Sequence, residues 1–374
     1  MSFLEYSQKM APTGLRKVLH LNWPIIILIT SVASVGFLML YSIAGGNLDT
    51  WARPQMERFG VGMVLLFIVG MVPIWFWRSM SATAYLVAFA LLLVVEFFGS
   101  VGMGAQRWID LGFIRLQPSE MVMVLAAYYG WLDPRKVSSP VYVLIPVLLI
   151  VTPTILVLMQ PNLGTSLMLI LAGATVMFAA GVSLWYFGAV IALGVSVIVG
   201  VFTLRGTPWQ FLHDYQYKRI DTFLDPTADP LGAGYNIIQA QIALGSGGWS
   251  GKGFMQGTQS RLNFLPEKHT DFIFTTLAEE FGFIGACSLL TLYALIVAFC
   301  FQSAMRNKDR YGSLLTYGVA TTFFLFFAVN MGMVTGLMPV VGVPLPLVSY
   351  GGTAMIIILT AFGLVQSAHI HRPR

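Results

Sequence analysis

Ten runs of predominantly apolar residues follow one another along the chain, separated by short polar segments and by one long one. A helix that crosses a lipid bilayer needs about 20 mostly apolar residues, and most of these runs are long enough to form one. The fourth run is short and opens at Pro118, a residue that suits the first turn of a helix. The ten predicted spans are residues 23–44, 59–77, 83–103, 118–132, 141–159, 164–181, 184–203, 272–302, 312–338 and 343–369.

Composition strengthens this pattern. The chain is 57% hydrophobic and only 10% charged, with a mean hydropathy of +0.77, whereas a soluble domain carries about 25% charged residues. We therefore predict an all-α, polytopic integral membrane protein with ten transmembrane helices, organised as a single membrane domain over residues 1–374. The first run is a full span without a small-residue cleavage site, so we expect no signal peptide. Cys287 and Cys300 share one apolar run and predict neither a disulfide framework nor a metal cluster.

Basic residues gather at the ends of the apolar runs, and their distribution sets the orientation in the membrane. The net charge of +5 could indicate nucleic acid binding, but the basic residues form no stripe that would bind it. Ten spans place both termini on one side, where the connecting segments carry 11 Lys and Arg residues, against 4 in the short loops opposite. Because cytoplasmic loops are enriched in Lys and Arg, we expect both termini in the cytoplasm. The long polar segment 204–271 is then an extracytoplasmic loop.

This outer loop ends in a polar cluster, residues 264–272, that leads into the eighth span. Asp271 stands at the start of that helix, where a carboxylate can serve as a helix cap. Lys268 and His269 in the same turn favour a chemical role, because nearby cations lower the pKa of a carboxylate and keep it ionised. An ionised Asp271 could act as a general base or as a ligand to a divalent cation such as Mg²⁺ or Mn²⁺. The sequence leaves these two roles open.

A glycine-rich turn over residues 244–253 carries Lys252 near its end. The ATP-binding pattern fails, because Ser246 stands where its first glycine should be and Gly253 where its final Ser or Thr should be. Exposed backbone N–H groups beside one lysine remain a reasonable site for a lipid-linked diphosphate. A flexible surface turn is the alternative interpretation.

Acidic residues lie inside the apolar runs, where they are costly and are functional candidates by default. They are Glu96, Glu120, Glu279 and Glu280. Glu120 is in the first turn of its helix, where the helix dipole alone would favour it. Glu279 lies two turns beyond Asp271, about 80° around a regular helix, so we expect it to line a cavity that begins at Asp271. Glu280 would point to the opposite face.

A proline-rich segment interrupts the last apolar run. Pro339, Pro344 and Pro346 precede Ser349 and two glycines, and backbone of this kind cannot continue a helix. Non-helical backbone at membrane depth is tolerated only when it is buried in protein or lines a wet cavity. The segment therefore predicts a cavity that opens outward.

Arg107 and Trp108 lie in the outer segment after the third span. Trp108 is most simply an anchor at the membrane interface, although its place beside Arg107 favours a contact with a sugar or with the outer loop. Trp51, in the preceding outer segment, is expected to matter little.

Together these motifs resemble the SEDS family of cell-wall polymerases (shape, elongation, division and sporulation). The resemblance covers nearly the whole chain after the first span. The valine-rich segment 338–344 favours the branch that acts in cell elongation and rod shape over the branch that acts in division. The segments that carry the resemblance are residues 107–109, 117–120, 160–161, 163–165, 225–226, 229–235, 242–248, 264–272 and 344–352.

The resemblance implies a protein of the bacterial inner membrane that polymerises lipid II into glycan strands at the outer face. It implies a class B penicillin-binding protein as crosslinking partner, and it maps the essential aspartate of the family onto Asp271. Membrane lipids are the remaining expected partners, and nucleic acid is not expected. A leaving diphosphate needs cations around it. The residues that we expect to bind substrate are Arg107, Trp108, Glu120, Lys252, Arg261, Lys268, His269, Glu279 and Ser349.

A transporter that flips lipid II without chemistry is the alternative function, because broken helices and intramembrane acids suit either protein. Polar groups concentrated at the outer face favour the polymerase. The chain departs from the family pattern at Met123, where lysine is usual, and at Asn162, where aspartate is usual. We interpret the two changes as the joint loss of one ion pair, because a lone buried charge is costly whereas the loss of both partners can be neutral.

The orientation can be tested with a reporter that is active only outside the cytoplasm. Fused after Arg374, the reporter should give no signal, whereas insertion near Thr227 in the outer loop should give a strong one, as the distribution of Lys and Arg requires. The reverse pattern would overturn the assignment of both termini.

Overall fold

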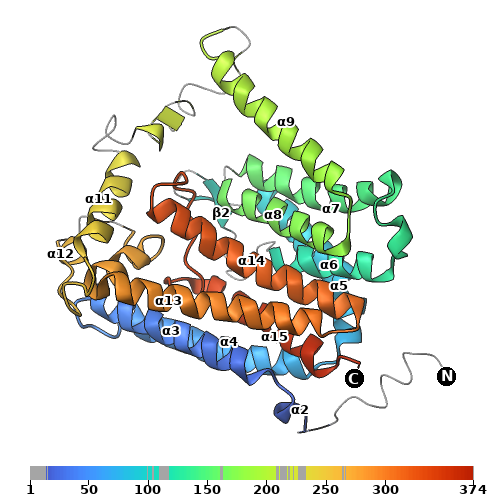
Figure 1. Cartoon of the computed structure of the whole chain (residues 1–374), viewed down its shortest axis with the longest axis horizontal. Helices are drawn as coiled ribbons and strands as arrows, with labels where there is room; N and C mark the ends of the chain where they lie inside the picture. The colour runs from blue at the N-terminus through green and yellow to red at the C-terminus, as the bar shows by residue number, and fades with distance from the viewer. Residues whose placement is uncertain are drawn as a thin grey trace.

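A computed structural model shows the arrangement of the chain (Figure 1). The structure describes residues 14, 16–98, 100–102, 105–108, 118–160, 163–207, 210, 217, 220–221, 223–225, 233–262, 265 and 267–373. Each of the ten predicted apolar runs contains a helix. The ten helices are α3 (Trp23–Ile43), α4 (Ala52–Met71), α5 (Ile74–Phe98), α6 (Pro118–Trp131), α7 (Pro140–Met159), α8 (Leu163–Ala180), α9 (Leu184–Thr203), α13 (Ile273–Met305), α14 (Arg310–Val334) and α15 (Gly352–Ile370).

The predicted polytopic helical fold is confirmed. Within the described residues, nine helices are long and apolar enough to cross a membrane, and α6, with 14 residues, is the short tenth that the sequence predicts. Several predicted boundaries are wrong. α5 begins at Ile74 rather than at 83, so Arg78 lies on this helix. α4 begins at Ala52 rather than at 59, so Arg53 and Arg58 lie on this helix and not in a loop. α15 begins at Gly352 rather than at 343, because the prolines before it exclude a helix.

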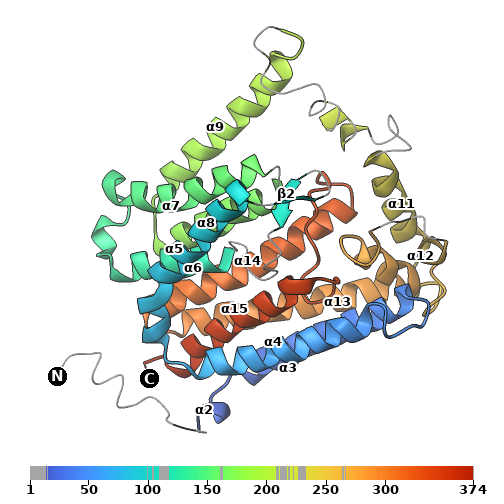
Figure 2. The same cartoon turned by 180° about the vertical axis from the view of Figure 1, so that it is seen from behind.

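The helices form a bundle around α14. This helix packs against α6, α8, α13 and α15, while α4 lies along α15 and α3 along α13, as both views show (Figures 1 and 2). Ile25, Ile29, Leu66 and Leu359 are completely buried at these contacts. In a membrane such close packing, rather than apolar character alone, holds helices together. α9 stands apart in both views, and Val201 is its one buried residue.

Between α14 and α15 the chain is non-helical, as predicted, and most of residues 343–349 are buried. Its polar groups find partners inside the protein. The carbonyl of Val343 accepts a hydrogen bond from Asn330 Nδ2 at 2.7 Å, and the N–H of Leu345 donates to Ser349 Oγ at 2.8 Å. Val343, Leu345 and Ser349 are all buried. These bonds meet the requirement that backbone leaving a helix at membrane depth be satisfied by the protein.

The described part of the outer loop is folded. It contains α11 (Ala233–Ser246), which packs against α13, and the single-turn helix α12 (Thr258–Arg261). A small antiparallel hairpin follows α5 and is formed by β1 (Ser100–Gly102) and β2 (Ala105–Trp108). The remaining short elements are α2 (Arg16–Leu19) and the 3₁₀ turn η1 (Pro134–Lys136).

α13 is interrupted at Gly282, whose φ of 65° and ψ of −162° are far from helical values. Glycine adopts this conformation without the steric cost that a side chain would bring. A Cβ at Gly282 would also overlap the backbone of Gly251 and Trp249, which lie directly against it. α13 therefore consists of two helical pieces, and the glycine-rich turn of the outer loop is folded into the gap between them.

This break predicts a specific stability effect. Gly282→Ala should lower the free energy of unfolding by at least about 1–3 kcal/mol, because the backbone is strained for any residue with a Cβ. Gly188→Ala is the matched control, because Gly188 lies in α9 with open space around it, and alanine there should be stabilising by about 0.5–1 kcal/mol. Thermal unfolding in detergent measures both variants. Equal melting temperatures for the two would contradict the proposed strain.

Candidate active site

Asp271 lies in the turn that precedes α13 and is partly buried. Burial and the negative charge of Glu267 raise the pKa of Asp271 to about 6. The predicted lowering of this pKa by Lys268 and His269 is wrong, because desolvation outweighs any effect of these neighbours. Burial also lowers the pKa of His269, which keeps its ring neutral near pH 7. The capping alternative is not observed, since the N-cap residue of α13 is Phe272, without a side-chain cap.

Two buried side chains fix the backbone around Asp271. Asn330 on α14 donates from Nδ2 to the carbonyl of Asp271 at 2.9 Å, and the same amide bonds Val343. Ser349 donates from Oγ to the carbonyl of Thr270 at 2.5 Å. Asn330 is 0% exposed and Ser349 only 5%. Ser349 therefore holds the turn against the proline-rich segment, and its predicted contact with substrate is not supported.

The carboxylate of Asp271 faces Gly342. A side chain at Gly342 would come within 3.7 Å of Asp271 Oδ2. Among the residues that the structure describes, no hydrogen bond or ion pair engages this carboxylate. The absence of a side chain at Gly342 leaves space in which a reacting group can approach Asp271.

Aromatic rings and one guanidinium surround this turn. Trp51 stacks on His269 with ring centroids 4.2 Å apart and meets Tyr350 edge-on at 4.8 Å. Arg58 on α4 lies over the Tyr350 ring at 4.8 Å, and its buried NH1 atom has no hydrogen-bond partner in the described part of the chain. The sequence reasoning missed these residues. The predicted start of the second span at residue 59 places Arg58 in a loop, although an arginine within a span is a functional candidate. The expectation that Trp51 matters little stays a prediction, although Trp51 contacts His269 and Tyr350.

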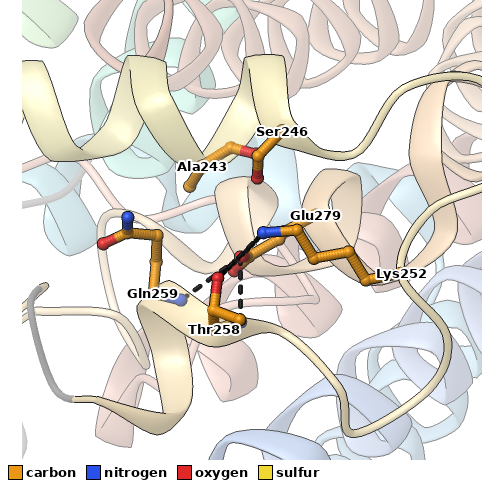
Figure 3. A network of polar contacts seen from close by, with 6 residues as sticks. All are labelled: Ala243, Ser246, Lys252, Thr258, Gln259 and Glu279. Carbon is orange, nitrogen blue, oxygen red and sulfur yellow. Dashed lines mark hydrogen bonds and ion pairs between the residues drawn. The ribbon is translucent and has the colours of Figure 1, made fainter.

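Glu279 belongs to a second polar cluster (Figure 3), and the printed bonds of this cluster do not include the carboxylate of Asp271. Its Oε1 atom accepts from Lys252 Nζ at 2.6 Å and from the backbone N–H and Oγ1 of Thr258 at 2.9 and 2.8 Å. The side chain of Glu279 is 0% exposed and that of Lys252 29%. The predicted position of Glu279 along a cavity from Asp271 is therefore wrong, and Lys252 is engaged by Glu279 rather than free for a diphosphate. Glu280 accepts from Ser42 Oγ on α3 at 2.5 Å.

Three N–H groups at the end of the glycine-rich turn are engaged within the protein. Lys252 N donates to the carbonyl of Glu279 and Gly253 N to that of Glu280, both at 3.0 Å, while Gly251 N donates to Gly247 O at 2.8 Å. These donors are not available to a diphosphate, whereas residues 248–250 are exposed, and the diphosphate site in this turn stays a prediction. The sequence pattern could not distinguish exposed from docked backbone.

The other predicted substrate-binding residues that the structure describes differ in burial and in hydrogen-bond partners. Glu120 lies in the first turn of α6 and accepts from Ser119 Oγ at 3.1 Å. Arg261 ends α12 and is exposed. Lys268 is half-buried, and burial lowers its pKa. Among the predicted cations that the structure describes, Arg261 and Lys268 lie outside the Glu279 cluster.

Three predicted positions cannot be placed fully. Arg107 and Trp108 lie on β2, but their side chains fall outside the described residues, as does Asn162. Met123 is buried on α6, 6% exposed. The interpretation of Met123 and Asn162 as a lost ion pair stays a prediction.

A partly open apolar cavity with a volume of about 40 Å³ lies between α6, α14, α15 and the proline-rich segment. Ser119 and Thr322 supply the hydroxyl groups of an otherwise apolar lining. Pro346, which belongs to the proline-rich segment, also lines the cavity. The lining residues include Pro118, Ser119, Thr322, Phe323, Pro346 and Ile358. A hydrocarbon chain suits such a lining better than a polar ligand does.

Within the described ranges, no group of three His, Cys, Asp or Glu side chains could hold a metal ion. Asp271 could contribute one carboxylate to a divalent cation. The other ligands of a Mg²⁺ ion would then come from substrate phosphates and water, an arrangement that this ion commonly adopts.

The fold and the site define a multi-pass membrane protein whose helical bundle holds an apolar cavity and a carboxylate, Asp271, that no hydrogen bond or ion pair from the described residues engages. The chain belongs to the FtsW/RodA/SpoVE family of cell cycle proteins, whose model matches residues 21–374.

Individual relatives agree with this assignment. The chain is 40% identical to the peptidoglycan glycosyltransferase MrdB of Escherichia coli K12 over 357 residues, 94% of each chain. It is similar to a chain of a peptidoglycan synthase complex that coordinates polymerization and crosslinking, with a TM-score of 0.79 and 28% identity over 93% of this chain and 97% of that one. The rod shape determining protein RodA of Thermus thermophilus matches with a TM-score of 0.66 and 25% identity over 95% and 98%. The predicted resemblance to the elongation branch is confirmed.

The structural role of Ser349 can be tested. Ser349→Ala should lower the free energy of unfolding by about 1–3 kcal/mol, because the N–H of Leu345 and the carbonyl of Thr270 would lose a buried partner. Ser196→Ala is the control, since Ser196 is exposed on α9 and bonds only within its own helix. Thermal unfolding of the two variants should separate them, and identical transitions would mean that Ser349 does not hold the turn.

Proposed function

We propose that this protein is a peptidoglycan glycosyltransferase that polymerises lipid II during cell elongation, with Asp271 as the group that carries the chemistry. The glycosyltransferase activity is the one that the relative MrdB, 40% identical, has in its name. The observation that carries the role of Asp271 is its partly buried carboxylate beside Gly342, which has no hydrogen-bond or ion-pair partner among the described residues. A buried carboxylate without a structural partner is costly to keep, which favours a functional role.

In the proposed reaction, a sugar hydroxyl of lipid II attacks the anomeric carbon of the growing strand. The bond from that carbon to the undecaprenyl diphosphate breaks, the diphosphate leaves with the electron pair, and Asp271 accepts the hydroxyl proton. A pKa of about 6 leaves Asp271 about nine-tenths ionised at pH 7 while making it a stronger base than an ordinary aspartate. Coordination of a divalent cation by Asp271 is the competing role.

Cations near the Asp271 turn would stabilise the leaving diphosphate. Arg58 is the added candidate, because its buried NH1 atom has no hydrogen-bond partner within the described ranges. Arg261 and Lys268 remain candidates from the sequence, whereas Lys252 is engaged by Glu279. The apolar cavity beside Pro346 is suited to the hydrocarbon chain of a lipid-linked substrate.

The proposal includes a location and a partner. The site would face the outside of the bacterial inner membrane with both termini in the cytoplasm, as the distribution of Lys and Arg favours. A class B penicillin-binding protein would crosslink the product. Support for that partner comes from the similarity to a chain of a synthase complex that couples polymerization to crosslinking.

Asp271→Asn tests the proposal directly. With purified protein and lipid II, polymer formation should fall about 100- to 10,000-fold, the usual effect of removing a general base. The polymerisation rate of the unaltered protein should also fall as pH falls through about 6, where Asp271 becomes protonated. Near-normal polymer yield from the Asn variant would reject the role of Asp271.

A stability measurement separates loss of chemistry from loss of folding. Because the pKa of Asp271 is raised in the folded state, the stability that its protonated form provides is lost as pH rises through about 6. Asp271→Asn should therefore be at least as stable as the unaltered protein at pH 7. Asp133→Asn, at the exposed start of η1, serves as the control for activity.

A further inference from the structure

The break in α13 exchanges hydrogen bonds with the outer loop. In a continuous α-helix, the N–H groups of Phe283 and Ile284 would donate to the carbonyls of Glu279 and Glu280. These carbonyls instead accept from the N–H groups of residues 252 and 253, both at 3.0 Å. The freed N–H groups of Phe283 and Ile284 donate to the carbonyls of residues 248 and 249, at 2.9 and 3.2 Å. We refer to residues 247–253 as the glycine strap.

The strap fits the break only because it lacks side chains at the points of contact. A Cβ at Gly247 would overlap the carbonyl of Ala278, and a Cβ at Gly251 would overlap the carbonyl of Glu280. The strap and the first piece of α13 therefore touch backbone to backbone at Gly247 and Gly251.

The Glu279 side chain adds an ion pair with Lys252 to this backbone contact. Its Oε1 atom accepts hydrogen bonds from Lys252 Nζ, at the end of the strap, and from the backbone N–H and the hydroxyl of Thr258, at the start of α12 (Figure 3). Lys252 Nζ also donates to Thr258 Oγ1 at 2.8 Å. A buried carboxylate needs such a partner, since an uncompensated ion in this environment is strongly destabilising.

The locked end of α13 is mechanically connected to Asp271. Every residue from 272 to 280 is buried, so this buried segment is held along its whole length. Eight residues separate Glu279 from Asp271, which is about 12 Å of helix. At the far end, Asn330 bonds the carbonyl of Asp271. The segment is thus a short rigid rod with the strap at one end and Asp271 at the other.

We infer that Lys252 and Glu279 are positioning residues, whose ion pair locks the glycine strap into the break and so fixes where the buried segment places Asp271. Neither residue needs to touch substrate for this role. The inference rests on the proposed function, because Asp271 must be the group whose position matters for the rate. It replaces the sequence-based assignment of both residues to substrate binding.

Steady-state kinetics with lipid II provides the test. Lys252→Met removes the charge at similar length and should lower kcat about 10- to 100-fold, because a displacement near 1 Å can cost that much. KM should change by less than about twofold, since no substrate contact is lost. Lys252→Arg, which keeps the charge, should recover most of kcat. Lys308→Met, in the exposed connection between α13 and α14, is the matched control and should behave as the unaltered protein.

The double variant Lys252→Met with Glu279→Gln tests the ion pair itself. It should be more active than Lys252→Met alone, because it leaves no unpaired buried ion. Hydrogen exchange provides a readout independent of activity: residues 272–280 should lose protection in Lys252→Met but not in Asp271→Asn. If Lys252→Met does not fold, Thr258→Val is the milder lesion in the same cluster and should lower kcat about 3- to 10-fold with KM unchanged.

The outcomes separate this inference from the proposed function. If the unaltered protein forms no polymer, or Asp271→Asn is fully active, the proposed function fails. If those two behave as expected but Lys252→Met raises KM at constant kcat, Lys252 binds substrate directly and the positioning role is overturned. Unchanged kcat and unchanged protection in Lys252→Met would overturn it equally.

Discussion

Backbone groups that leave a helix inside a membrane must find new partners within the protein, and this requirement shapes the whole site. It applies at two places, the break at Gly282 and the proline-rich segment before α15. At the first, the glycine strap supplies donors and acceptors. At the second, Asn330 and Ser349 do so from buried positions. Asp271 lies between these two sets of hydrogen bonds, and both sets determine its location.

Three carboxylates within ten residues of α13 have different surroundings and therefore different roles. Glu279 has a lysine and three hydrogen bonds, and Glu280 has a hydroxyl from α3. Asp271 has no such partner among the residues that the structure describes, and its backbone carbonyl is held by Asn330. Holding a catalytic group by its main chain leaves the carboxylate available for a proton or a cation. The fold thus separates the groups that fix the helix from the group that reacts.

The sequence predicted the parts of the structure that depend on local pattern. Apolar runs located the helices, and the prolines before Ser349 located the non-helical segment, because both follow from short-range chemistry. The position of Asp271 at the start of α13 was also predictable. The pKa of Asp271 was not, because the charges of Lys268 and His269 are visible in the sequence whereas burial is not.

Contacts between distant segments explain the other errors. The pairing of Lys252 with Glu279 depends on how the outer loop folds back, and the glycine-rich turn has the same composition whether it is exposed or docked. Trp51 meets His269 across more than two hundred residues of chain. Arg58 was missed for a local reason, since a helix boundary placed several residues too late moved it into a loop.

The glycine strap also has a consequence for how this region can change in length. Two consecutive donors and two consecutive acceptors of the strap pair with fixed atoms on α13, so the spacing between them is set by the helix. Inserting or deleting one residue between Gly248 and Gly253 would shift one pair of bonds against the other and would carry a side chain into a gap that admits none. Substitution of Gly251 and insertion beside it are therefore constrained by the same contact.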